Sequence, residues 1–130
     1  MRLSDAATAF VTERRLATLS TLRPDGTPHV VPVGFTWDGT TARVTMRVTS
    51  RKAQNVAQAP GGTARAAVCS VEGRRWITLE GPARISDDPE DVAEAVRRYA
   101  VRYERTPAPD PARVVLLLAV DRVMASADLR

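Results

Sequence analysis

Residues Met46 to Pro60 read MRVTSRKAQNVAQAP, and a strand pattern changes into a helix pattern within them. From Ala42 to Thr49, apolar residues alternate with polar ones, which is typical of a strand with one buried face. Ser50 is a suitable N-cap for a helix over Arg51–Ala59, which Pro60 and the two glycines after it would end. The stretch therefore predicts a strand that turns sharply into a short helix.

Two cations follow the predicted N-cap, and Lys52 is the only lysine among the 19 Lys and Arg residues. A helix N-terminus has unpaired N–H groups and a partial positive charge, so it attracts anions. Arg51 would add a planar fork for a phosphate, and Lys52 a compact charge. The joint is therefore a candidate anion clamp. The same residues also fit an ordinary solvated helix start, and from them alone that is the simpler interpretation.

The composition of the chain limits the possible functions. Residues 1–130 fit a single domain, and the net charge of +4 favours an anionic partner. Aromatic residues make up only 5% of the chain, too few for the stacking platforms of a nucleic-acid-binding barrel. No apolar run has the length of a membrane span, and no signal peptide is apparent, so we expect a cytoplasmic protein without a membrane span. Cys69 is the only cysteine, so neither a disulfide nor a metal site is expected.

The segment Pro28–Trp37 alternates like a strand, but it carries Pro32 and Gly34 on the same face. Proline cannot donate a ladder hydrogen bond and glycine has no side chain to pack, so the pair marks an edge, a bulge or a close approach to the backbone. A flat ring lying against the strand would explain both residues. A kink that lets a barrel close would explain them equally well.

The remaining predicted strands are Leu16–Thr21, Thr63–Val71, Arg75–Ser86 and Arg113–Ala125, and the remaining predicted helices are Ser4–Arg14 and Asp87–Glu104. Gly81-Pro82 predicts a bulge or bend in the fifth strand. Val114–Val120 is continuously apolar, which predicts that both faces of the last strand are buried, one of them against another chain. Six mostly antiparallel strands with Gly and Pro kinks indicate a mainly β (α+β) fold, a small barrel with flanking helices.

Four segments stand in a distinctive order along the first half of the chain: Leu16–Thr21 (LATLST), Pro24–Val33 (PDGTPHVVPV), Trp37–Gly39 (WDG) and Arg51–Val56 (RKAQNV). Gly81-Pro82-Ala83 and Asp121-Arg122-Val123 follow in the second half. In this order and spacing the segments resemble the flavin-binding split-barrel superfamily, which is related to pyridoxamine 5′-phosphate oxidase. Within it, they resemble the small oxidoreductases that use the deazaflavin coenzyme F420.

The resemblance implies a six-stranded antiparallel split β-barrel that forms a homodimer, with two cofactor sites at the subunit interface. It implies that the cofactor phosphate lies at the turn formed by Ser50, Arg51 and Lys52, and that the isoalloxazine-like ring faces the segment from Val31 to Val33. Trp76 would reach the site of the neighbouring subunit. The cofactor-binding residues implied in this way are Val31, Pro32, Val33, Arg47, Thr49, Ser50, Arg51, Lys52, Asn55 and Trp76.

The resemblance further implies an oxidoreductase in which reduced coenzyme F420 transfers a hydride to an electron-poor small organic acceptor. The phosphodiester and oligoglutamate tail of this coenzyme suit a basic groove that Arg43, Arg47, Arg51 and Lys52 would form. FMN is the alternative cofactor, in a flavin oxidoreductase or in a flavin carrier or sensor without turnover. No catalytic residue is assigned, because His29 is the only histidine and its place in a strand favours a structural role. The acceptor stays open between quinones, unsaturated lactones, tetrapyrroles and furan-type compounds.

Overall fold

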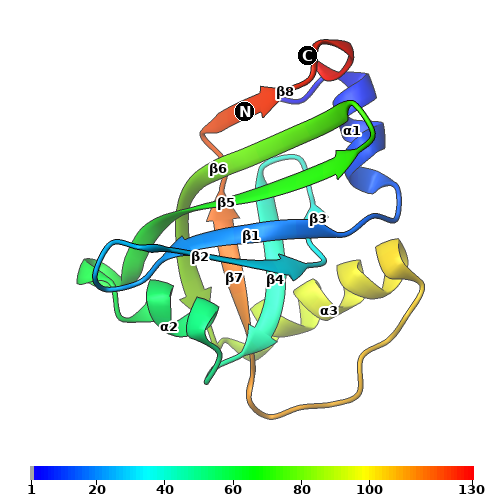
Figure 1. The fold of residues 1–130 in the computed structure, drawn as a ribbon. Coiled ribbons are helices and arrows are strands. Elements are labelled where there is room, and N and C mark those ends of the chain that lie inside the picture. The colour runs from blue at the N-terminus through cyan, green and yellow to red at the C-terminus, as the bar shows by residue number, and fades with distance from the viewer. Residues whose placement is uncertain (1) are drawn as a thin grey trace.

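Residues 2–130, which the computed structural model describes, form eight strands in one antiparallel sheet that curls into a half-open barrel with three flanking helices (Figure 1). The strands are β1 (Ala17–Leu22), β2 (Pro28–Val33), β3 (Thr36–Trp37), β4 (Thr41–Arg47), β5 (Thr63–Glu72), β6 (Arg75–Ser86), β7 (Arg113–Ala119) and β8 (Arg122–Ala125). The helices are α1 (Asp5–Thr12), α2 (Arg51–Ala57) and α3 (Pro89–Tyr103), and short 3-10 turns lie at Pro60–Gly62 and Ala127–Leu129.

The strands follow the order β2-β1-β5-β6-β7-β4-β3, and β8 also pairs with β6. All the pairings are antiparallel. Alternate side chains point into the barrel and form the core, as the alternation in the sequence predicts. Among the fully buried residues are Leu19, Val44, Val68, Leu79 and Leu116, each from a different strand. The predicted split-barrel, mainly β class is therefore confirmed.

Two of the six predicted strands are each divided, which accounts for the eight that the structure contains. The predicted strand Pro28–Trp37 breaks after β2, at Gly34, where a Cβ atom would lie 2.9 Å from Cζ of Tyr103. The last strand breaks between β7 and β8, opposite Gly81, where a Cβ atom would lie 2.0 Å from the carbonyl oxygen of Ala119. Each break therefore lies where another part of the chain occupies the space of a missing side chain.

The second break is a bulge, but it is not on the strand that carries Gly81-Pro82. Between the pairs Ala83–Leu118 and Glu80–Arg122, three residues of the last strand face two residues of β6. Strand β6 itself runs without interruption from Arg75 to Ser86. The extra residue therefore belongs to the partner strand, which bends where glycine lets it approach.

The helices close the barrel from outside. Ser4 caps α1, because its Oγ accepts a hydrogen bond from the amide of Ala7 at 3.0 Å, and the same Oγ donates to the carbonyl of Leu129 at 2.8 Å. This bond holds the two ends of the chain together, at the top of Figure 1. Helix α3 packs on β3, β4 and β7. No helix in the described part of the chain is long and apolar enough to cross a membrane.

One prediction about the last strand is confirmed in part. The apolar run from Val114 to Val120 was expected to bury one face against another chain. Within the single chain, however, Val115 is already fully buried, and α3 packs on the strand that carries it. The chain's own helix thus covers part of this face, but Leu117 is half-buried and Ala119 is exposed on it, so its contact with another chain stays a prediction.

Candidate functional site

The turn between β4 and α2 has the predicted geometry of a capped helix start. Ser50 Oγ accepts a hydrogen bond from the amide of Ala53 at 3.4 Å and donates to the carbonyl of Arg47 at 2.7 Å. Ser50 is therefore the N-cap of α2, and Arg51 and Lys52 occupy its first turn. The capped backbone therefore fixes the positions from which the side chains of Arg51 and Lys52 extend.

A hollow of about 270 Å³ opens beside this turn, and we call it the Lys52 hollow. Its lining residues come from β2 and the residue after it, from β4, α2, α3 and β7, and from the connection between α3 and β7; they are Pro32, Val33, Gly34, Thr45, Lys52, Tyr99, Arg105, Pro107 and Arg113. The structure thus brings the predicted ring-facing residues Pro32 and Val33 to the same cavity as Lys52, although about twenty residues separate them in the sequence.

The Lys52 hollow carries positive charge that the protein does not neutralise. Lys52, Arg105 and Arg113 make no ion pair with any carboxylate among residues 2–130. Arg113 donates from Nη2 to the carbonyl of Ala108 at 2.7 Å, which orients its guanidinium without cancelling its charge. An anion entering the hollow would meet three cations and would displace no carboxylate. This arrangement favours a ligand with more than one negative group.

Sequence reasoning missed Thr45, Tyr99, Arg105 and Arg113 as residues of this hollow. Arg113 enters it because β7 pairs with β4 in the register that sets Arg113 opposite Arg47. That pairing joins residues from two distant parts of the chain, so only a correct strand order could have found it. Thr45 lies on the polar face of β4, where alternation gave a usable signal.

The other predicted clamp residues lie around the hollow without lining it. Arg47 is exposed and donates from Nη1 to Asp110 Oδ2 at 3.1 Å. Thr49 lies in the exposed turn before Ser50, Arg51 is exposed at the start of α2, and Val31 is half-buried in β2. None of these residues lines the hollow within the described chain, and their contact with a cofactor stays a prediction.

Asn55 supports the turn from behind. Its side chain is only 5% exposed, and Nδ2 donates to Thr21 Oγ1 on β1 at 3.0 Å. The cross-strand neighbour of Thr21 is His29, whose Nδ1 is buried and has no hydrogen-bond partner in the described part of the chain. His29 is thus built into the packing between β2 and its neighbours. Within residues 2–130 no three His, Cys, Asp or Glu side chains are grouped to hold a metal ion.

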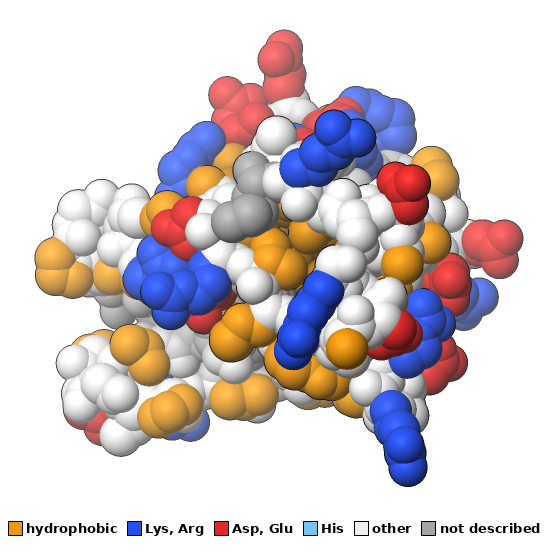
Figure 2. Space-filling view, turned by 90° about the horizontal axis from the view of Figure 1, so that it is seen from above, with side chains coloured by type: hydrophobic (Ala, Val, Ile, Leu, Met, Phe, Trp, Pro, Cys, Tyr) orange, Lys and Arg blue, Asp and Glu red, His pale blue; other side chains and the backbone are white. Residues whose placement is uncertain are grey.

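Trp76 lies at another hollow, of about 500 Å³, which Leu3, Met124 and Leu129 also line. The backbone there is fixed by Ser126, whose amide donates to the Trp76 carbonyl at 3.0 Å. Figure 2 views the molecule from this end and shows hydrophobic side chains within a rim of charged ones. A single chain does not bring Trp76 to the Lys52 hollow, so its proposed reach into a neighbour's site stays a prediction.

Helix α3 holds the corner that follows the ring-facing segment. The carbonyl of Phe35 accepts hydrogen bonds from Tyr103 Oη at 3.0 Å and from Arg102 Nη1. Burial raises the pKa of Tyr103, so its hydroxyl stays protonated and keeps donating. The rings of Tyr99 and Tyr103 fill the space that a side chain at Gly34 would need. The close approach that the sequence indicated at Gly34 is thus made by a ring of the protein itself.

Comparisons with known proteins agree with this architecture. The profile of the family described as pyridoxamine 5′-phosphate oxidase matches residues 3–126. The F420H(2)-dependent biliverdin reductase of Mycobacterium tuberculosis (strain CDC 1551 / Oshkosh) is 49% identical over 130 residues, which cover 98% of this chain and 91% of the relative.

Two solved structures share the fold. One, named F420 Reductase, is 25% identical with a TM-score of 0.73, and the match covers 89% of this chain and 94% of that chain. The other, a conserved hypothetical protein from Mycobacterium tuberculosis, is 26% identical with a TM-score of 0.78, over 94% of this chain and 83% of that chain. Because the family profile spans nearly the whole sequence, the chain belongs to the pyridoxamine 5′-phosphate oxidase family, as its ordered segments predicted.

Proposed function

We propose that this protein is an oxidoreductase that uses reduced coenzyme F420 to reduce an electron-poor small organic acceptor. The observation that carries the proposal is the Lys52 hollow, which joins the segment of Pro32 and Val33 to three cations that have no carboxylate partner among residues 2–130, Lys52, Arg105 and Arg113. The relative that is 49% identical is an F420H(2)-dependent reductase, which supports the same cofactor. The four predicted segments of the sequence point in the same direction.

The residues of the hollow fit the chemistry of the coenzyme. Its phosphodiester and oligoglutamate tail carry several negative charges, and the hollow offers three cations that pair with no carboxylate in the described chain. Pro32 and Val33 offer apolar surface to a flat ring. When bound, the reduced coenzyme supplies a hydride.

The protein's part in the reaction is to bind, orient and exclude water. Lys52, Arg105 and Arg113 would hold the anionic groups, while Pro32 and Val33 would orient the ring. Tyr103 fixes the corner behind them through Phe35. Among the described residues, the lining of the hollow includes neither a carboxylate nor a histidine, so we assign the proton that the acceptor takes up to solvent.

We also propose a homodimer that completes the site. The outward face of β1, β2 and β5 has no helix over it (Figure 1), and it exposes Leu22, Val30 and Val71 by 52, 55 and 62%. Pro32 is exposed on the same face of β2 and also lines the Lys52 hollow. A partner on this face would therefore enlarge a hollow that is small for the whole coenzyme.

The dimer can be tested by sedimentation. The expected result is a dimer for the natural chain and a monomer for Val30→Glu, because a carboxylate among the apolar side chains of this face is costly to bury. Thr27→Glu, in the exposed turn before β2, is the matched control and should remain a dimer. A natural chain that sediments as a monomer at micromolar concentration would contradict this part of the proposal.

The acceptor to test first is biliverdin, which is named for the relative at 49% identity. Reduced coenzyme F420 is mixed with protein and biliverdin, and the return of the oxidised coenzyme is followed by absorbance. We expect turnover that Lys52→Ala slows through a higher KM for the coenzyme. If no turnover occurs with biliverdin, a quinone or an unsaturated lactone, although the coenzyme binds, the protein is a carrier of the coenzyme.

A further inference from the structure

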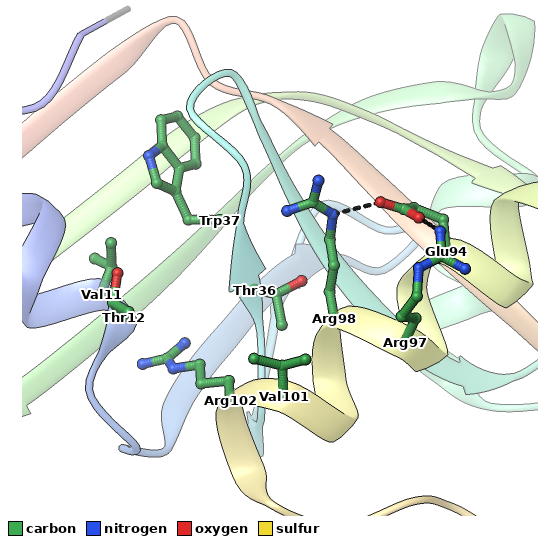
Figure 3. A pocket seen from close by; sticks show the side chains of 9 residues that line it. All are labelled: Val11, Thr12, Thr36, Trp37, Glu94, Arg97, Arg98, Val101 and Arg102. Carbon is green, nitrogen blue, oxygen red and sulfur yellow. Dashed lines mark hydrogen bonds and ion pairs between the residues drawn. The ribbon is translucent and has the colours of Figure 1, made fainter.

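A second hollow, of about 450 Å³, lies between α1, β3 and α3, and we call it the Trp37 hollow (Figure 3). Helix α3 lines this hollow with residues 94, 97, 98, 101 and 102, and it lines the Lys52 hollow with Tyr99. Different faces of one helix therefore form the walls of two separate cavities. The proposed cofactor site accounts for the Lys52 hollow and leaves the Trp37 hollow without a role.

Arg98 presents an unused guanidinium fork to the Trp37 hollow. Its Nε donates to Glu94 Oε1 at 2.7 Å, which fixes the plane of the group. Its two terminal nitrogens have no hydrogen-bond partner among the described residues, and Figure 3 shows them turned toward Trp37. A fork held in this way is preorganised for the two oxygens of a carboxylate.

The charge around this fork is positive. Glu94 is shared between Arg98 and Arg97, so one carboxylate faces two guanidinium groups. Arg102 is bonded only to backbone carbonyls, those of Glu13 and Phe35, and it has no acidic partner in the part of the chain that the structure describes. The hollow thus has three arginines and one glutamate in its lining. The arginines of this hollow therefore outnumber the acidic side chains that line it.

The adjoining hollow adds two acidic residues and one more arginine. This adjoining hollow shares Thr12, Trp37 and Arg98 with the Trp37 hollow, and Asp5 and Asp38 also line it. Asp38 is bound by Arg43, at 2.5 Å between Oδ2 and Nη1, and by the amides of residues 40 and 41. Asp5 shares its hollow with Arg2.

The rest of the lining suits a ring. Trp37 offers an indole surface next to the fork, and Val11 and Val101 add apolar walls. Thr36 is 6% exposed, and its hydroxyl has no hydrogen-bond partner among residues 2–130. A buried hydroxyl without a partner is unusual in a folded protein, and it lies where a polar group of a ligand could satisfy it after a small rotation.

From these observations we propose that the Trp37 hollow is a second binding site, which takes a small aromatic carboxylate. The carboxylate pairs with the terminal nitrogens of Arg98, and the ring lies against Trp37. The volume is within the range of small-molecule pockets, which favours a compact ligand over a segment of another protein. The site acts independently of the proposed cofactor, because other residues line it.

The test uses 4-nitrobenzoate as the probe, since a nitroaromatic ring quenches an indole that it touches. In Trp76→Phe, Trp37 is the only tryptophan, so quenching reports this hollow alone. We expect saturable quenching with a Kd of about 0.1–1 mM, in keeping with a ligand of this size. The uncharged amide, 4-nitrobenzamide, should bind at least about tenfold more weakly, because it lacks the charge that the fork recognises.

Variants in the Trp76→Phe chain locate the site. Arg98→Gln should weaken the binding of 4-nitrobenzoate by about tenfold or more. Arg84→Gln removes an exposed arginine of β6, which makes no ion pair in the described part of the chain, and should leave the Kd within about twofold. Lys52→Ala should also leave it unchanged. Circular dichroism and urea unfolding establish that each variant is folded.

Three results would overturn the proposal in a folded protein: no saturable quenching at millimolar probe, equal binding of acid and amide, or loss of binding in Lys52→Ala. Coenzyme F420 is titrated in parallel, and Arg98→Gln should bind it as the natural chain does. Failure of the coenzyme to bind would contradict the proposed function and leave this site standing. If only 4-nitrobenzoate fails to bind, the result contradicts the second site and leaves the proposed function standing.

Discussion

The Lys52 hollow and the Trp37 hollow share helix α3 and are both rich in cations, but they hold these cations differently. Lys52, Arg105 and Arg113 have no carboxylate partner in the described chain, whereas Arg97 and Arg98 share Glu94. Free cations can adjust to a ligand with several negative groups along its length. A fork fixed by a glutamate suits one carboxylate in one orientation. The comparison indicates that the arrangement of acidic partners, more than the number of arginines, distinguishes the ligands.

The corner at Gly34, which lines the Lys52 hollow, gives the largest expected effect. In Gly34→Val the new side chain would enter the space of Tyr99 and Tyr103, where even a Cβ lies 2.9 Å from Tyr103 Cζ. We expect overpacking to lower the free energy of unfolding by about 3 kcal/mol. Urea unfolding measures this loss. The free energy of unfolding of Gly34→Ala should lie between those of Gly34→Val and the natural chain. An unchanged unfolding midpoint in Gly34→Val would contradict the packing at this corner.

The Lys52 hollow itself is broken by Lys52→Ala. Loss of a charge-assisted hydrogen bond should weaken the binding of coenzyme F420 by roughly 1.5–3 kcal/mol, without a change in 4-nitrobenzoate binding. Arg51→Ala should have a smaller effect, because Arg51 does not line the hollow. Fluorescence titration measures both, with Arg84→Ala as the control for loss of a surface charge. If both clamp variants bind the coenzyme normally as folded dimers, the clamp lies elsewhere.

Next to the Trp37 hollow, Asp38 makes the stability depend on pH. Burial alone would raise its pKa, but hydrogen bonds from Arg43 and from the amides of Thr41 and Thr40 outweigh burial and hold the pKa well below its usual range. A lowered pKa stabilises the fold above the unfolded value of about 3.9, and this stabilisation is lost as the pH falls below it.

We therefore expect Asp38→Asn to cost about 1.5 kcal/mol at neutral pH and to unfold with a flatter dependence on pH in the acid range. Thermal unfolding from neutral pH to pH 2 measures both. Asp87→Asn is the control, since Asp87 is exposed and makes no ion pair within residues 2–130. Identical dependence of stability on pH in Asp38→Asn and the natural chain would show that the ion pair of Asp38 with Arg43 does not stabilise the fold.

The smallest effect separates the two tyrosines of α3 that pack against Gly34. Tyr103→Phe removes the bond to the Phe35 carbonyl, but Arg102 still donates to the same oxygen, so we expect a loss of only about 1 kcal/mol. The hydroxyl of Tyr99 has no hydrogen-bond partner in the described chain, so Tyr99→Phe is the matched control and should unfold like the natural protein. Equal losses in the two variants would mean that ring packing, not the hydroxyl, fixes the corner.

The sequence predicted best where the cause is local. The N-cap at Ser50, the two cations after it and the alternation in β4 involve neighbours in the chain, and the structure has them as predicted. Gly34 was noticed, but its cause was not, because Tyr99 and Tyr103 lie about seventy residues later. Arg113 was missed for the same reason, since only the pairing of β4 with β7 brings it to Lys52.

Patterns of hydrophobicity also cannot say which partner covers a buried face. The run around Val115 correctly indicated burial, while the layer over part of that face proved to be α3. Trp76 shows the same limit. Its place on β6 could be predicted from the sequence, but the hollow that it lines could not.

The most direct test of the central claim is a fluorescence titration of the purified protein, free of cofactor, with coenzyme F420 and, in parallel, with FMN. Binding of the deazaflavin in preference to FMN, weakened in Lys52→Ala, is the result that the Lys52 hollow predicts. A preference for FMN, or the binding of neither compound by a folded dimer, would contradict the assignment of this hollow to the deazaflavin.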